Sequence, residues 1–223
     1  MSPDIVEALV KTIELKDQST AAHTWRVVLY ARALAERAGM KPEFIARLTT
    51  GAALHDVGKI DIPDNILQKP GKLTDEEFEV IKSHTVVGHE RLRRMGEDDP
   101  ILLDLVRHHH ERVDGKGYPD GLRGDQIPVV ARYFAVIDTF DALTSVRPYR
   151  REVGIEAAEK AIIELKNGVE TRYDPAAVEI FVDLYRQGEL DWILSYFNDG
   201  SDVPAVTELA STPGKTAPDK IKV

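Results

Sequence analysis

Helix-start signals recur along this 223-residue chain, and they limit its fold more than any other feature. A helix start is marked by a polar N-cap residue, a proline in the first turn or an acidic first turn. Such signals stand at Ser2-Pro3, Asp17–Thr20, Pro42, Thr74–Glu77, Asp99-Pro100, Pro128 and Asp174-Pro175. Apolar residues follow them at helical spacing, and no stretch alternates like a half-buried strand. We therefore predict an all-α fold of roughly seven or more helices.

The domain organisation follows from length and local composition. A chain of this length, 43% hydrophobic, can bury one sizeable core. We expect residues 1–16 to form an N-terminal connecting helix and residues 17–199 to form the main domain. Ser, Pro, Thr, Lys and Asp dominate from Gly200 onward, so residues 200–223 are predicted to be a flexible tail. The segment 60–71, which contains Pro63 and Pro70, is expected to be a loop.

Charge and cysteine content exclude several classes of function. The net charge of −9 argues against a DNA- or RNA-binding protein or a binder of anionic membranes. The chain has no cysteine, so any metal would have to bind histidine and carboxylate. No apolar run reaches membrane-spanning length, and Met1–Asp4 lacks the pattern of a signal peptide. We expect a cytoplasmic protein without a membrane segment, in which a local positive site could still bind a small phosphate ligand.

The apolar run Ala52–Leu54 ends in His55-Asp56 and is followed by Gly58 and Lys59. An imidazole nitrogen next to a carboxylate suits divalent metal ions. An isolated pair of this kind is more simply interpreted as a helix-terminal histidine beside a solvated aspartate. Lys59 is either an ordinary surface cation or, beside a metal-bound anion, a ligand for a substrate phosphate.

Other histidines and one aspartate recur in predicted helices. His23 lies in the first turns of its helix and, taken alone, indicates a structural role. His84 follows Phe78 and Ile81 at spacings of three, on the apolar face of the helix that starts at Thr74. His84 can therefore be interpreted either as a hydrogen-bonded histidine of the core or as a metal ligand. In His108–His110, adjacent helical residues point about 100° apart, so two but not three can face one centre unless the helix end unwinds.

Asp138 lies within the most apolar predicted helix, where burial is costly unless a carboxylate is paired or bound to a cation. Asp141, one turn later, could orient a neighbour. The candidates together supply seven nitrogen and oxygen ligands. They are His23, His55, Asp56, His84, Asp138 and two of the three consecutive histidines. Such a set exceeds one tetrahedral zinc ion and suits two adjacent octahedral ions bridged by a carboxylate, as in dinuclear hydrolases.

The same residues give the chain a resemblance to the HD-GYP domains, a bacterial branch of the HD metal-dependent phosphohydrolases. The resemblance covers about residues 10–190 and rests on several motifs in order. The matching stretches are Asp17–Val27, His55–Lys59, Lys69–Glu77, Ile81–His84 with Gly88, His109–Pro119, and Asp138–Thr144 with Arg147–Arg150. The histidine pair of the family directly precedes Glu-Arg, which selects His109 and His110 and leaves His108 on the helix surface.

The resemblance implies a catalytic domain over residues 17–199 that hydrolyses cyclic di-GMP to linear pGpG, to GMP or to both. One ion would bind His23, His55, Asp56 and Asp138, and the second would bind His84, His109 and His110 and share Asp56. Asp56 and Lys59 are the expected catalytic residues, with Lys59 on the scissile phosphate. The expected substrate-binding residues are Lys59, Asp141, Arg147, Arg150 and the loop Gly117-Tyr118-Pro119.

The resemblance also implies which cofactors and partners to expect. Two divalent ions are expected, because Ser19 replaces a glutamate that binds a third ion in some members. Iron or manganese suits the ligand set best, with nickel, cobalt and zinc as alternatives. Val113 replaces a common aromatic residue, which affects expected base stacking. Beyond a cyclic dinucleotide, the partners considered are a diguanylate cyclase and a second copy of the chain. The alternative functions are hydrolysis of cyclic GMP-AMP and dinucleotide sensing without cleavage.

Overall fold

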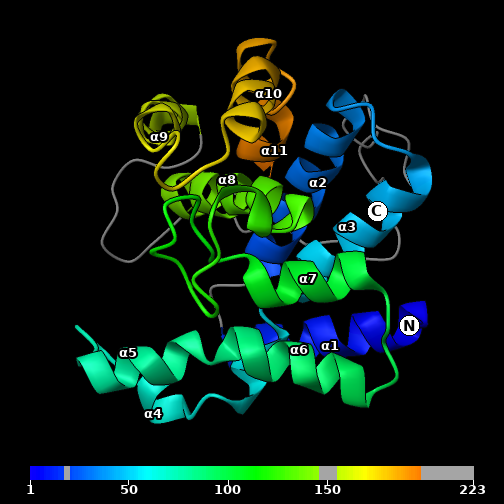
Figure 1. The fold of residues 1–223 in the computed structure, drawn as a ribbon, viewed down its shortest axis with the longest axis vertical. Coiled ribbons are helices and arrows are strands. Elements are labelled where there is room, and N and C mark those ends of the chain that lie inside the picture. Colours follow the sequence, from blue (N-terminus) through cyan, green and yellow to red (C-terminus); the bar gives the residue numbers. More distant parts are fainter. Residues whose placement is uncertain (18–20, 146–154, 197–223) are drawn as a thin grey trace.

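The computed structural model describes residues 1–17, 21–145 and 155–196 (Figure 1). The helices are α1 (Pro3–Lys16), α2 (Ala21–Arg37), α3 (Pro42–Leu54), α4 (Asp64–Leu67), α5 (Asp75–Lys82), α6 (His84–Arg94), α7 (Pro100–His108), α8 (Val129–Thr144), α9 (Ile155–Asn167), α10 (Pro175–Arg186) and α11 (Asp191–Tyr196). Two 3-10 helices, η1 (Val57–Asp61) and η2 (Gly124–Gln126), join them. These residue ranges contain isolated β-bridges but no strand, so the predicted all-α class is confirmed.

Several predicted helix starts are confirmed by their caps. The Thr74 hydroxyl accepts a hydrogen bond from the Glu77 amide at 3.3 Å, and the Glu77 carboxylate accepts one from the Thr74 amide at 2.8 Å. The Asp99 carboxylate caps α7, and the Asp174 carboxylate accepts from the amide of Ala177 at the start of α10. These bonds satisfy amides that the first helical turn leaves without partners.

Two predictions about local structure were wrong. The segment 60–71 is not simply a loop, because η1 extends to Asp61 and α4 covers Asp64–Leu67 after Pro63 at its N-cap. The helix that begins after Thr74 does not continue through His84. It ends at Lys82, and the Ser83 hydroxyl donates to the Val80 carbonyl oxygen at 2.6 Å. His84 therefore begins a new helix, α6, instead of lying in the middle of the old one.

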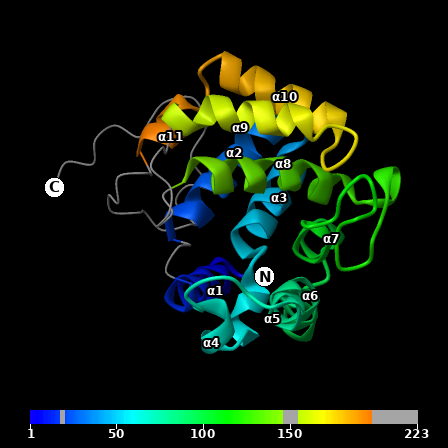
Figure 2. The ribbon, with the colours of Figure 1, turned by 90° about the vertical axis from the view of Figure 1, so that its left-hand side faces the viewer.

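The helices form three tiers, which Figures 1 and 2 show from two directions. The tier of α9, α10 and α11 and the tier of α1, α4, α5 and α6 lie on opposite sides of α2, α3, α7 and α8. One core runs through the molecule, with Trp25, Tyr30, Phe134, Phe140 and Phe181 among its largest fully buried side chains.

The first helix takes part in this core, since Val6, Val10 and Ile13 of α1 are buried in it. The predicted domain boundary at residue 16 stays a prediction, and the predicted tail 200–223 lies outside the described residues. No helix in the described part is long and apolar enough to span a bilayer.

Candidate metal centre

Three helix ends meet between the central tier and the tier of α1, α4, α5 and α6. His55 is the C-cap of α3, and Asp56 follows it where the chain leaves the helix for η1. His84 is the first residue of α6. The C-cap of α7 is His109, and the chain has left the helix at His110. Two of the three consecutive histidines, His109 and His110, therefore face one centre, as the helical spacing allows.

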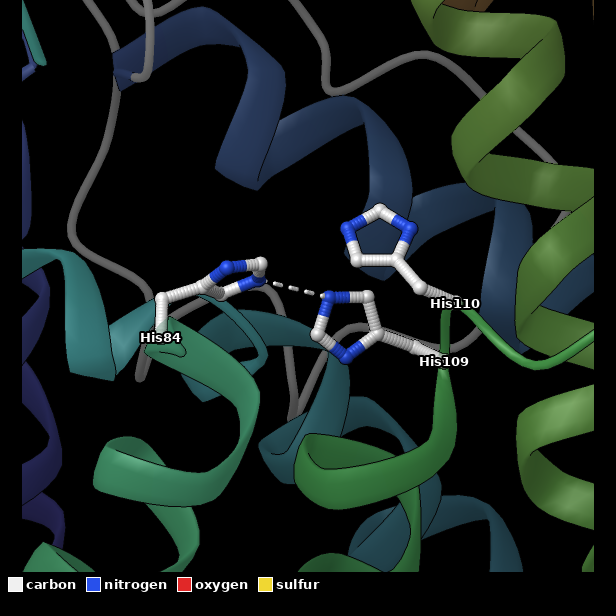
Figure 3. Close-up of side chains that lie close together, drawn as sticks. All are labelled: His84, His109 and His110. Carbon is white, nitrogen blue, oxygen red and sulfur yellow. Dashed lines mark hydrogen bonds between the residues drawn. The ribbon is translucent and has the colours of Figure 1, made fainter. Parts of the chain in front are cut away.

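Two groups of potential ligand atoms result, each with its atoms within 4.8 Å of one another. The first consists of His23, His55 and Asp56, and the second of His84, His109 and His110. Figure 3 shows the rings of the second group gathered between α6 and the end of α7. The structure thus brings together six of the seven predicted ligands, and the seventh, Asp138 on α8, has Oδ1 3.8 Å from His23 Nε2.

Asp56 lies between the imidazoles of the two groups. Its Oδ2 is 3.3 Å from His55 Nε2 and its Oδ1 is 3.4 Å from His84 Nε2. Within the groups, the Nε2 atoms of His23 and His55 are 3.3 Å apart, and those of His84 and His109 are 3.2 Å apart. Two ligands about 2.1 Å from one ion are about 3.0–3.4 Å apart at ordinary coordination angles. Each oxygen of Asp56 therefore faces a different ion position.

The distances between ligand atoms suit bound metal ions, and the protonation of the histidines tests this interpretation independently. His55 Nδ1 lies 2.7 Å from the Ala52 carbonyl oxygen, and His84 Nδ1 lies 2.7 Å from that of Ile81. His109 Nδ1 lies 3.0 Å from a third carbonyl oxygen, that of Val106. A carbonyl only accepts, so each Nδ1 carries the proton, and a neutral ring then presents a bare lone pair at Nε2.

Bare lone pairs on His84 and His109 face each other across 3.2 Å, an arrangement that needs a cation between them. Protonation is an unfavourable way to supply that charge. Burial lowers the pKa of His84 and, with the adjacent His110, holds the pKa of His109 well below its usual value. Burial likewise lowers the pKa of His110 to about 4. The second group is therefore a set of neutral imidazoles, the form that binds metal.

His23 is oriented by a carboxylate instead of a carbonyl. Asp141 on α8 has no exposed surface, and its Oδ2 lies 2.7 Å from His23 Nδ1. The guanidinium of Arg26 donates to both oxygens of the same carboxylate. Such carboxylate–histidine pairs fix the tautomer and direction of a metal-binding ring. Asp141 thus lies behind His23, as a residue that orients a neighbour would, and this position does not fit its expected contact with substrate.

Lys59 extends into the space beside Asp56. Its Nζ lies 2.8 Å from Asp56 Oδ2 and 3.2 Å from Asp17 Oδ2. Burial alone would raise the pKa of Asp56, but Lys59 and His55 outweigh it and hold that pKa well below its usual range. Burial would also lower the pKa of Lys59, but Asp56 and Asp17 raise it instead. The aspartate is therefore anionic and the lysine cationic at neutral pH.

The predicted loop closes one side of the second group. The Tyr118 ring lies 4.8 Å, centroid to centroid, from the ring of His110. A Cβ on Gly117 would come within 2.6 Å of the backbone of His110, Glu111 and Arg112, so only glycine fits there. The structure therefore places Gly117 and Tyr118 directly beside the histidine pair.

Glu111 holds the remainder of this loop. Its side chain is buried, and its carboxylate accepts hydrogen bonds from the amides of Asp120, Gly121 and Leu122 at 2.7–3.1 Å. A carboxylate that accepts several backbone hydrogen bonds fixes an irregular segment that has no helix or strand of its own.

The sequence-based interpretation did not identify Arg26, Asp17 or Glu111 as site residues. Arg26 lies three residues after His23, a spacing that places both on one face of α2, and this was the available signal. Arg147, Arg150 and Ser19 lie outside the described residues, so their expected roles stay predictions.

Comparisons with known proteins place the chain in a family. The HD domain family model matches residues 7–177. A Thermotoga maritima protein named cyclic di-GMP phosphodiesterase is 41% identical over 82% of the chain and 50% of its own length. A Vibrio cholerae protein named 3′3′-cGAMP-specific phosphodiesterase 2 is 34% identical over 82% of the chain and 34% of its own length. The chain thus spans half or less of the length of these two relatives.

A solved structure shares the fold at lower sequence identity. It is titled as a cyclic GMP-AMP specific phosphodiesterase of V. cholerae, V-cGAP3. The TM-score is 0.66 at 14% identity, over 95% of this chain and 54% of the other.

Proposed function

Because the chain belongs to the HD domain family, and within it to the HD-GYP branch, we propose that it is a metal-dependent phosphodiesterase. Its proposed substrate is cyclic di-GMP, hydrolysed to linear pGpG, to GMP or to both. The observation that carries this proposal is the position of Asp56, which turns one oxygen toward each of two histidine groups. A carboxylate that faces two groups of imidazoles, one of them neutral, supports a two-ion phosphodiester hydrolase.

The proposed ligand sets follow the two groups. One ion would be held by His23, His55, Asp56 and Asp138, and the other by His84, His109, His110 and Asp56. Such ions, when bound, neutralise the charge of a phosphodiester and lower the pKa of the attacking water. We favour iron or manganese, because the ligands are all nitrogen and oxygen, with nickel, cobalt and zinc as alternatives.

The chain's own residues then place the substrate. Lys59 stays protonated and is fixed by Asp56 and Asp17, so it would hold a positive charge beside the scissile phosphate. Tyr118 would limit how the ligand enters, because its ring stands against that of His110. A diguanylate cyclase partner, a homodimer and a cytoplasmic location stay predictions.

Metal removal and reloading test the proposal. Protein reconstituted with manganese or ferrous iron is expected to convert cyclic di-GMP, and chromatography separates pGpG from GMP. Dialysis against a chelator should remove the metal and lower turnover by about 1000-fold or more, and the same metal should restore it. If reconstituted protein binds metal but cleaves no cyclic dinucleotide, the proposed activity is wrong and a sensing module remains.

Cyclic GMP-AMP is the second candidate substrate, favoured by the 34% identical V. cholerae relative. Both dinucleotides share the phosphodiester that the metal centre would hold, so the centre does not choose between them. Comparing kcat/KM for the two substrates on one preparation decides which is preferred.

A substitution of Asp141, which contacts His23 on the side away from the proposed metal ions, tests whether Asp141 orients that ring. Asp141→Asn keeps the size of the side chain but loses the full negative charge that Arg26 and His23 share. We expect about 10–100-fold weaker metal affinity, the usual effect of losing an outer-shell carboxylate, measured by competition with a chelator. Asp183→Asn, which alters an exposed partner of Arg37, is the matched control. Unchanged affinity in Asp141→Asn would show that His23 needs no orienting carboxylate.

A further inference from the structure

Helix α5 ends two residues before His84 and contributes no residue to the core. None of its residues is buried, and Phe78 on it is 45% exposed. In Figure 1, α5 extends away from the central tier at the start of α6. Part of the Phe78 ring is therefore accessible to a ligand.

Lys82 connects Phe78 to the metal centre. Its Nζ lies 5.0 Å from the centre of the Phe78 ring and 5.6 Å from the centre of the Tyr118 ring. These distances are typical of cation–π contacts. Tyr118 in turn stands against His110, and Lys82 lies two residues before His84. Phe78 and Lys82 are thus the outer end of a continuous row of contacts that begins at the proposed metal ligands.

We propose that Phe78 and Lys82 form a subsite for one guanine base of the substrate. This inference rests on the proposed function and adds two residues that set base preference. An exposed aromatic face can stack on any base. A lysine ammonium donates to O6 and N7 of guanine, whereas adenine presents an amino group in place of O6. Phe78 therefore supplies stacking, and Lys82 supplies discrimination between the purines.

Lys82 lies near the rings of Phe78 and Tyr118, and within the described residues its one ion pair is with an exposed carboxylate. Its Nζ pairs with Glu79 Oε1 at 2.6 Å, but the Glu79 side chain is largely exposed. An exposed pair of this kind contributes little energy, so the ammonium can exchange the carboxylate for a base oxygen at low cost. Lys11 forms an equivalent pair with Glu7 on α1, which makes it a matched control.

The test measures kinetics on metal-loaded protein with cyclic di-GMP as substrate and cyclic di-AMP as competitor. Lys82→Gln is expected to raise KM for cyclic di-GMP about tenfold with kcat within about twofold, and to leave the inhibition constant of cyclic di-AMP unchanged. Lys82→Arg should restore most of the lost affinity. Phe78→Ala should weaken both dinucleotides about tenfold, because stacking does not distinguish bases. Lys11→Gln and Ile163→Ala, which alter exposed side chains elsewhere, should change neither constant.

Other outcomes overturn the inference. If Lys82→Gln weakens both dinucleotides equally, Lys82 contacts a phosphate and not a guanine base. If neither Lys82→Gln nor Phe78→Ala changes KM, α5 lies outside the binding site. If the wild-type protein cleaves no cyclic dinucleotide, the proposed function fails, and calorimetric titration with GMP and AMP tests the subsite separately. Tighter binding of GMP that is lost in Lys82→Gln would support the subsite, and equal binding of GMP and AMP would reject it.

Discussion

Alanine at position 56 is expected to abolish metal retention and turnover together, with activity falling about 1000-fold or more. The reason is the position of Asp56 between the two histidine groups, with Oδ2 3.3 Å from His55 Nε2 and Oδ1 3.4 Å from His84 Nε2. Its loss removes a ligand from both proposed ion positions at once. It also removes the anion that offsets the charge of two closely spaced cations.

Metal content per chain and turnover are the measurements, made on the same preparations of Asp56→Ala. Asp138→Ala provides an internal comparison, since Asp138 lies near His23 and belongs to one proposed ligand set. It should lose metal from that set and retain it at His84, His109 and His110. Asp61→Ala, which alters an exposed carboxylate paired with Arg91, should retain both metal and activity. Full metal content in Asp56→Ala would refute the bridging assignment.

Two adjacent pairs of side chains at the centre could be predicted from the sequence as short motifs, whereas His23, His84 and Asp138 gained a ligand role only from the whole set and the family resemblance. His55-Asp56 and His109-His110 are adjacent in the chain and lie where a helix ends, so one local conformation fixes both members of each pair. The distance from Asp56 to His84, by contrast, depends on how η1 packs against α6. Periodicity within one helix carries no information about that contact.

The supporting residues were harder to predict for the same reason. Arg26 and Asp17 act through another side chain, and their partners Asp141 and Lys59 lie far away in the sequence. An isolated arginine or aspartate has no local pattern that separates such a role from an ordinary surface charge. Asp141 lies against His23, so its orienting role stays a prediction, but the substrate contact also expected of it does not fit its complete burial.

The fold was predictable where local hydrogen bonds decide it. Thr74, Asp99 and Asp174 lie at helix starts, and their side chains cap the first turn as the sequence indicates. The four-residue helix α4 is too short to show a helical period. The break at Ser83 arises from one serine hydroxyl that bonds to the preceding turn, which a smooth apolar spacing from Phe78 to His84 conceals.

Gly58 of η1 lies in close backbone contact with the first turns of α6. A Cβ on Gly58 would lie 1.9 Å from the His84 carbonyl oxygen and 2.7 Å from the Gly88 amide nitrogen. Both obstacles are backbone atoms, so no side-chain rotation relieves them. Gly58→Ala must therefore push η1 away from α6 and draw Asp56 away from His84. We expect about 3 kcal/mol less free energy of unfolding, since overpacking costs about 1–3 kcal/mol and backbone obstacles lie at its upper end.

For a chain of this size, that loss corresponds to a fall in Tm of about 6–12 °C, measured by calorimetry on metal-free protein. Metal affinity should fall as well, because the bridging carboxylate and His84 separate. Gly88→Ala should act in the same direction but more weakly, as its Cβ would lie 2.9 Å from the Gly58 nitrogen. Gly39→Asn is the control, because that position has a φ of +68° and open space, and asparagine tolerates this conformation. If Gly58→Ala melts and binds metal like Gly39→Asn, η1 and α6 are free to separate without cost, and the close backbone approach does not hold Asp56 against His84.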